Sequence, residues 1–275
     1  MSDRASEAAI AASLLAVERR HALALHAAIR IPSDRVAIAV SSSTITPAGA
    51  LVAIRREADE VEARVYGAVQ ESRADSRKTS RRAQEAAILA LLLLGKKRGV
   101  GDFSYHPRTS FHLAEEGIAS DAASAMSAAR SVAAAWGQTT IASYNRWRSN
   151  VSAATRGDPL PTSGPYRTPG ARAGGYEDLA TEVRKTPKVI EARIDRVNAT
   201  EIAQAHNEEA KRVVDELPKH IRAAIEYVWS AVNDKRTCPA CSSLDGKVSV
   251  GGDFNGQWPP AHPLCRCVVY PRRKI

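Results

Sequence analysis

All four cysteines of the 275-residue chain lie in its last 38 residues, together with one histidine. The cluster consists of Cys238, Cys241, His262, Cys265 and Cys267. A C-x2-C pair on a turn can present two thiolates to one ion, and cysteines two residues apart on an extended segment point to the same side. Zn²⁺ accepts thiolate and imidazole in tetrahedral geometry, whereas Ca²⁺ and Mg²⁺ require oxygen ligands. The spacing therefore predicts a zinc site, with five candidates for four positions.

Two features of this cluster stay open at the level of sequence. His262 is the weakest ligand candidate, because a turn histidine between Ala261 and Pro263 could instead donate a hydrogen bond from outside the ligand shell. Disulfide bonds are the alternative to zinc, since oxidising surroundings favour them and a reducing cytosol does not. Either cross-link would compensate for the small apolar core of the surrounding lobe. We take zinc as the preferred interpretation.

The elements that must position the cluster are short. Lys247–Val250 and Cys267–Tyr270 can pair as two strands, with Asp245-Gly246 as turn residues before the first. The sequence therefore predicts that residues 234–275 form a small α+β lobe that the Cys/His cluster cross-links.

Upstream of this lobe, apolar residues recur at helical spacing. Ile10–Ala28 predicts a first helix that ends near Ile31-Pro32, and Val36–Val40 alternates enough for a brief strand. A second helix is expected from Ala50, with an apolar seam that needs a partner helix. The seam consists of Leu51, Ile54, Ala58, Val61, Val65 and Ala68.

A third long helix is expected over Leu113–Arg148. Its aromatic residues Trp136, Tyr144 and Trp147 could stack on bases, but aromatic residues on an alanine-rich helix more often anchor packing.

A segment rich in proline and glycine, residues 157–175, is typical of a linker. It predicts an N-terminal helical region, residues 1–156, and a second part over 176–275. In that part we expect helices over Tyr176–Arg184 and Val189–Glu216, and a further helix from Pro218 to Asn233. The predicted fold class is mainly α, with long alanine-rich helices followed by the small α+β lobe.

The formal charge of +9 and the pI near 9.6 favour anionic partners, nucleic acid first. A solvated basic surface is the alternative, and for the cations between residues 73 and 82 it is the preferred one. No targeting signal is visible, and the most apolar run, Ala86–Leu94, is far shorter than a membrane span. The candidate phosphate-binding residues are Arg73, Arg77, Lys78, Arg81, Arg82, Lys96, Lys97, Arg98, Arg272, Arg273 and Lys274.

The ordered motifs around the cluster resemble the phage Mu F-like head morphogenesis domain. They are Asp234-Lys-Arg236-Thr237-Cys238-Pro-Ala-Cys241, Leu244-Asp245-Gly246 and Pro259-Pro260-Ala-His262-Pro263-Leu-Cys265-Arg266-Cys267. Upstream, Thr200-Glu201 followed by Asn207 resembles the helical Thr-Glu element of that domain, although Asn198 and Ala199 stand where the family usually has Ala-Arg. The resemblance covers about residues 176–275, and the N-terminal helices resemble no family that we can name.

The resemblance implies a structural protein and not an enzyme. Members of the family are minor head, or minor capsid, proteins that enter the prohead with the portal and influence DNA packaging or ejection. It therefore implies a place in the virion, in the capsid interior or at the portal vertex, after assembly in the host cytoplasm. The implied partners are the portal protein, other capsid components and packaged DNA bound without sequence preference, with a homo-oligomer as a further possibility.

Two other functions compete with this one. A metal-dependent nuclease of the HNH type needs a catalytic histidine beside the cluster, and the other six histidines show no such pairing. A zinc-containing nucleic-acid-binding protein would carry cations within the ribbon. Residues 238–267 instead hold Lys247 and Arg266 against Asp245 and Asp253, a net charge of zero. A scaffold role for the cluster is favoured.

Overall fold

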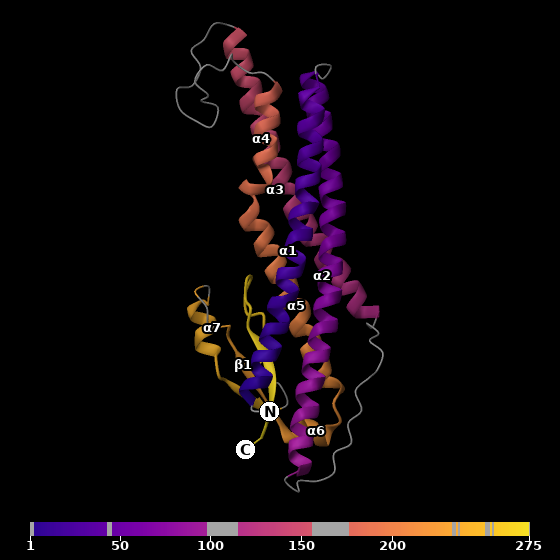
Figure 1. Cartoon of the computed structure of the whole chain (residues 1–275), viewed down its shortest axis with the longest axis vertical. Coiled ribbons are helices and arrows are strands. Elements are labelled where there is room, and N and C mark those ends of the chain that lie inside the picture. The colour runs from indigo at the N-terminus through magenta and orange to yellow at the C-terminus, as the bar shows by residue number, and fades with distance from the viewer. Residues whose placement is uncertain are drawn as a thin grey trace. The chain divides into compact units, whose positions relative to one another are not determined.

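The computed structural model describes residues 3–42, 46–97, 115–155, 176–232, 235, 237–250, 254 and 256–274. Over these residues the fold is mainly α, as predicted (Figure 1). The long helices are α1 (Asp3–Ser41), α2 (Pro47–Lys97), α3 (Glu115–Thr155), α4 (Tyr176–Val189) and α5 (Glu191–Glu216). The short elements that follow are α6 (Lys219–Ala224), β1 (Ile225–Ser230), α7 (Pro239–Leu244), β2 (Val248–Val250) and β3 (Val268–Arg273). Of the described helices, none is both long and apolar enough to cross a bilayer.

The chain forms two compact units that do not follow the predicted domain division. The cysteine unit comprises residues 1–22, 70–124 and 196–275, and the helical unit comprises residues 23–69 and 125–195. The predicted separation of residues 1–156 from 176–275 is therefore wrong. In the core of the cysteine unit, Ile10 and Leu14 of α1 pack with Ile202 of α5 and Val268 of β3. The expected linker, residues 157–175, lies outside the described residues.

Helix α1 continues through Pro32 to Ser41, so the predicted helix end at residues 31–32 and the strand over 36–40 are both wrong. Pro32 removes one backbone N–H, whereas Val36 and Val40 keep the helical spacing of fully buried positions. Ser33 Oγ donates to the Ile29 carbonyl at 3.0 Å and accepts from the Trp136 indole at 2.9 Å. Packing in the helical unit therefore outweighs the tendency of proline to end a helix.

The helical unit buries the predicted aromatic anchors and three of the six predicted seam residues, while Leu51, Ala58 and Ala68 are half-buried. Ile54, Val61 and Val65 of α2 are completely buried. Trp136, Tyr144 and Trp147 of α3 are buried as well, and the Tyr144 hydroxyl donates to the Pro47 carbonyl at 3.0 Å. The aromatic residues therefore anchor packing, and their rings are not exposed for stacking on bases.

A three-stranded antiparallel sheet lies at the centre of the cysteine unit, in the order β2-β1-β3. Val228 of β1 is opposite Val248 of β2 and Tyr270 of β3. Two predictions are corrected here. Residues 225–230 are a strand and not part of a helix, and the two predicted strands pair with β1 and not with each other. Since both faces of β1 are buried, its apolar run has no clear period-two alternation and resembles a buried helix segment.

The two faces of the sheet pack against different parts of the cysteine unit. Tyr227, Trp229 and Val269 belong to the core that contains the cysteines. Val228 and Val268 belong to the core that contains the first turns of α1. The sheet therefore connects the cysteine cluster to helices that are distant in sequence.

Candidate metal centre

The first two cysteines are placed by the beginning of α7. Cys238 is the N-cap residue, and Pro239 follows it at the first helical position, where a missing N–H costs nothing. The Cys238 sulfur accepts from the backbone N–H of Cys241 at 3.3 Å. Cys241 is buried one turn later. The Cys-Pro-Ala-Cys sequence thus brings two sulfurs together at one helix end.

The other three candidates lie on residues 262–267, the loop that leads into β3, which we call the ligand loop. The N–H of Cys265 donates to the His262 carbonyl at 3.0 Å, which makes a tight turn. Leu264 within this turn has a φ of 65°, an unusual conformation for a residue with a side chain. Cys265 and Cys267 are both buried. The turn and the following extended segment direct the candidates toward α7.

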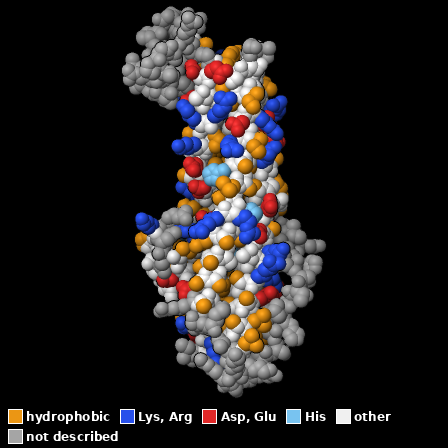
Figure 2. Space-filling view, viewed as in Figure 1, with side chains coloured by type: hydrophobic (Ala, Val, Ile, Leu, Met, Phe, Trp, Pro, Cys, Tyr) orange, Lys and Arg blue, Asp and Glu red, His pale blue; other side chains and the backbone are white. Residues whose placement is uncertain are grey.

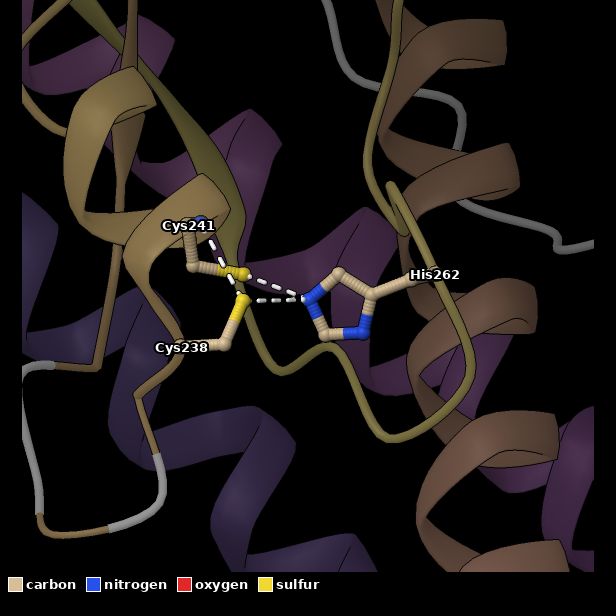
Figure 3. A group of neighbouring side chains, drawn as sticks. All are labelled: Cys238, Cys241 and His262. Carbon is tan, nitrogen blue, oxygen red and sulfur yellow. Dashed lines mark hydrogen bonds between the residues drawn. The ribbon is translucent and has the colours of Figure 1, made fainter.

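All five candidates meet, as the spacing predicted. The Nε2 atom of His262 lies 3.0 Å from the sulfur of Cys238 and 3.0 Å from that of Cys241 (Figure 3). The sulfurs of Cys241 and Cys265 are 3.6 Å apart. Tetrahedral zinc with Zn–S bonds of about 2.3 Å separates two sulfurs by roughly 3.8 Å. Two ligand groups, Cys238-Cys241-His262 and Cys241-Cys265-Cys267, share Cys241, and within each the ligand atoms lie within 4.8 Å of one another. The cluster could therefore hold a metal ion.

The His262 ring is oriented as in metal sites. Its Nδ1 atom lies 2.7 Å from the Pro263 carbonyl oxygen, so Nδ1 carries the proton and donates. This hydrogen bond raises the pKa of His262. Nε2 is left facing the two sulfurs (Figure 3). A backbone carbonyl that fixes the far nitrogen is the usual support for a metal-binding histidine.

The four thiols differ in their affinity for protons. A hydrogen bond from the Cys241 backbone lowers the pKa of Cys238. A hydrogen bond from the Cys267 side chain lowers the pKa of Cys265 to about 5. The hydrogen bond to Cys265 raises the pKa of Cys267, as does burial, and burial raises the pKa of Cys241 to about 12. Cys238 and Cys265 therefore lose their protons more readily than an ordinary cysteine. A bound cation would favour the thiolate form of Cys241 and Cys267 as well.

All four cysteines are free thiols in this structure. The 3.6 Å between the sulfurs of Cys241 and Cys265 is well beyond the length of a disulfide bond, about 2.05 Å. Free thiols are the form from which thiolate ligands arise.

Helix α5 holds the ligand loop through two residues of the Thr-Glu element. Thr200 Oγ accepts from the N–H of Leu264 at 3.0 Å. The Asn207 side-chain amide donates to the Cys267 carbonyl at 2.9 Å, and the Asn207 backbone carbonyl accepts from the Trp258 indole at 2.8 Å. Composition and ligand spacing gave no indication of this role. The only signal in the sequence was the resemblance of these positions to the motif.

The predicted Asp245-Gly246 turn joins α7 to the sheet. An Asp245 carboxylate oxygen accepts from the N–H of Ala231 at 2.8 Å. Gly246 has a φ of 75°, which glycine adopts without strain, and its N–H donates to the Trp229 carbonyl at 2.8 Å. The turn therefore fixes α7, and with it Cys241, against the centre of the sheet.

Three of the candidate phosphate-binding residues are buried inside the cysteine unit. Arg73, Arg77 and Arg81 are 0%, 1% and 7% exposed. For these three residues the preferred prediction of a solvated helix face is therefore wrong, and so is the alternative of phosphate binding. Because they are four residues apart, they share one face of α2, and that face meets carboxylates of α3 and α5.

Each of the three arginines forms ion pairs with at least two carboxylates. Arg73 lies 2.7 Å from Asp121 and 2.8 Å from Glu201, and Arg81 lies 2.6 Å from Glu209 and 2.9 Å from Glu216. Arg77 pairs with Asp121 and Glu208. We call these three arginines, with Asp121, Glu201, Glu208, Glu209 and Glu216, the arginine network.

The remaining cation candidates are scattered or lie outside the described residues. Lys78, Arg82 and Lys274 are exposed. Arg273 is half-buried, and Arg272 pairs with Glu226 at 3.1 Å. The side chains of Lys96, Lys97 and Arg98 lie outside the described residues. On the face drawn in Figure 2, Lys and Arg side chains are interspersed with Asp and Glu.

Residues 171–270 match the model of the family described as Phage Mu protein F like protein. This confirms the resemblance predicted from the motifs. The match ends within β3, so it contains all five cluster residues as well as Thr200 and Asn207. It supports a phage head morphogenesis protein and a component of the virion. Comparisons with curated proteins and with solved structures found no match.

Proposed function

We propose that this protein is a minor head protein of a phage, built around a structural zinc centre. One observation carries the proposal: the family match ends in a lobe where the motif residues form one site. Helix α7, the ligand loop and α5 each contribute to that site. In this proposal, the motif residues serve to hold the small C-terminal lobe together.

The zinc ion would cross-link two segments that are separated in sequence. Cys238 caps α7 and Cys241 lies within it, whereas His262 and Cys265 precede β3. Structural zinc sites have four protein ligands, whereas catalytic sites keep one position for water or substrate. With five candidates converging, the protein can fill every position. We therefore assign the centre a role in folding and no role in catalysis.

Within the five candidates, we assign ligation to Cys238, Cys241, His262 and Cys265. Both contacts of His262 Nε2 are to this set, and so is the 3.6 Å separation of the sulfurs of Cys241 and Cys265. Cys267 then stays outside the ligand set, and its side chain forms a hydrogen bond with the sulfur of Cys265. A cobalt-substituted sample tests this assignment, because the absorption between sulfur and cobalt distinguishes three thiolate ligands from four. Loss of one thiolate on Cys267→Ser would contradict the assignment.

The proposed place of the protein is the interior of the phage head, near the portal. There it would contact the portal protein and other capsid components, and packaged DNA without sequence preference. The support is the family match together with the net charge of +9. During packaging or ejection it would act as a structural part.

Deletion of the gene from its phage tests the proposal. We expect the protein in purified virions and in proheads, and we expect heads assembled without it to yield fewer infectious particles. Absence of the protein from both particle types would overturn the proposal. Magnesium-dependent DNA cleavage by the pure protein, lost in a His262→Ala variant, would favour a nuclease instead.

Elemental analysis tests the metal separately. Full-length protein purified under reducing conditions should contain about one zinc per chain. Protein without metal, with two disulfides by mass spectrometry under non-reducing conditions, would replace zinc with covalent cross-links.

A further inference from the structure

Helix α6 and the C-terminal end of β3 together carry an excess of positive charge. Residues 217–225 and 271–275 contain lysine and arginine but no aspartate or glutamate. In the cysteine unit, α6 and the end of β3 lie at the same end (Figure 1). Arg273 and Lys274 are among the candidate phosphate-binding residues, and Lys219 and Arg222 of α6 are additional cations. We call these four residues the basic end.

Backbone pairing and packing bring the two segments together. The N–H of Lys274 donates to the carbonyl of Ala224, the last residue of α6, at 3.2 Å. Arg273 is opposite Ile225 of β1, and Ile225 packs with Ile221 of α6 in the core that contains the cysteines. Since successive residues of a strand point to opposite faces, Arg273 lies on the face of the sheet against which α6 packs. The cations of α6 and of the end of β3 are therefore neighbours.

The contrast with Arg272 shows what the basic end lacks. The Arg272 side chain lies on the other face of the sheet, where it pairs with Glu226 at 3.1 Å. No carboxylate of the described residues forms an ion pair with a member of the basic end. Four positive charges at one end of a protein repel one another, and a bound anion would relieve this repulsion.

The members of the basic end differ in how they can meet a ligand. Lys219 and Lys274 are exposed. Arg222 is half-buried, and its guanidinium donates to the backbone carbonyls of Asp215 and Leu217 at 2.7 and 3.2 Å. The two lysines can therefore contact a ligand directly, whereas Arg222 contributes its charge from a fixed position.

A chain of phosphates fits this arrangement better than a single small anion. Lys219 begins α6, and Lys274 is bonded to its last residue. Five residues of helix separate these two points by about 7.5 Å. Along each strand of duplex DNA the phosphates follow one another at about 3.4 Å of helix axis, so the separation corresponds to roughly two steps. Lysine ammonium groups bind phosphate as point charges and carry no information about the bases.

We propose that the basic end binds the phosphate backbone of DNA without reading its sequence. The choice of DNA as the polyanion rests on the proposed function, in which the protein lies next to packaged DNA. The surface itself is defined by α6 and β3, and by neither the metal centre nor the helical unit. A negative DNA-binding result would therefore leave the assignment as a minor head protein intact, because the presence of the protein in particles tests that assignment.

Fluorescence anisotropy of a short labelled duplex over a salt series tests the proposal on the full-length, metal-loaded protein. Lys219→Ala combined with Lys274→Ala should weaken binding by about tenfold at low salt. The salt dependence should fall by about two phosphate equivalents, because each lysine neutralises one phosphate. Two duplexes of unrelated sequence should give the same result. Circular dichroism and zinc content establish that the variant keeps its fold.

Lys78→Ala combined with Lys188→Ala is the matched control, since it removes two exposed lysines outside the basic end. The control should retain the salt dependence of the unaltered protein. Equal losses in the two double variants would overturn the proposal, because they would reflect net charge and not a defined surface. Absence of binding at low salt would overturn it as well. If the variant of the basic end binds DNA normally but no longer binds poly-L-glutamate, the surface belongs to an acidic protein partner instead.

Discussion

The candidate metal centre and the arginine network are both partly buried clusters of ionisable residues in the cysteine unit, yet they differ in how their charges are balanced. The arginine network contains cations and carboxylates in contact, such as Arg73 with Asp121 and Glu201. The metal centre contains only groups that donate electron pairs to a cation. A buried cluster whose charges are matched internally has no need of an external ion, whereas a cluster of like ligands does. This difference makes the Cys/His cluster, and not the arginine network, the candidate for binding a cation.

Loss of the shared ligand should have the largest effect. Cys241 belongs to both ligand groups. We expect Cys241→Ser to abolish zinc binding at stoichiometric metal and to unfold the lobe around α7 and the ligand loop, because metal-binding free energy is folding free energy in such a site. Zinc content and limited proteolysis measure this. Cys267→Ser is the control and should retain zinc; equal loss in both variants would contradict the proposed ligand set.

Removal of one arginine from the network should have the next largest effect, a loss of stability. Arg77→Met leaves Asp121 and Glu208 without one of their partners in a buried setting. We expect a loss of about 3–5 kcal/mol in the free energy of unfolding, measured by urea denaturation. The exposed neighbour Arg82, changed to Met, should cost no more than about 0.5 kcal/mol. Equal stability of the two variants would mean that the network contributes nothing.

The support of the ligand loop by α5 should have an intermediate effect. Asn207→Leu removes the donor to the Cys267 carbonyl while keeping the size of the side chain. We expect zinc affinity to fall roughly 10- to 100-fold, because groups behind the ligands hold them in place. Competition with a chromophoric chelator measures the affinity. Gln204→Leu on the same helix is the control, and an affinity as low as that of Asn207→Leu would indicate a general effect on α5.

His206 provides a pH-dependent test on a third buried group of the cysteine unit. Burial lowers its pKa to about 3, from an ordinary value near 6.5. The unfolded chain therefore binds a proton between these values that the folded chain does not, so stability falls as the pH drops from 6.5 toward 3. At pH 5 the loss is about 2 kcal/mol. His206→Gln should abolish that part of the acid dependence, and an unchanged pH profile of unfolding would refute the assignment.

The C-terminal cations should give the smallest effect. Arg272, Arg273 and Lys274 are three of the candidate phosphate-binding residues, and we consider their joint replacement by Ala. Arg272 pairs with Glu226 and Arg273 is half-buried, so we expect the salt dependence of DNA binding to fall by about one phosphate equivalent. Affinity measured over a salt series checks this. A fall of three would show that all three cations reach DNA.

The comparison also shows where sequence reasoning succeeded. Cysteine and histidine spacing predicted the meeting of all five ligand candidates, because turns and short extended segments act over a few residues. The same is true of the Asp245-Gly246 turn and, in the α2 seam, of Ile54, Val61 and Val65. For Thr200 and Asn207, the motif indicated that the positions matter without indicating what they do.

Only the tertiary structure decided that the arginines of the network are buried and paired with carboxylates. Their spacing on α2 was visible in the sequence, but the carboxylates that neutralise them belong to α3 and α5, which are far along the chain. The same reason explains the central strand β1 and the interleaved units: each depends on burial by distant segments such as α1. The sequence determined which short-range groups could bind a cation. Only the folded chain determined which charges remain available, because burial and pairing are properties of contacts between segments far apart in sequence.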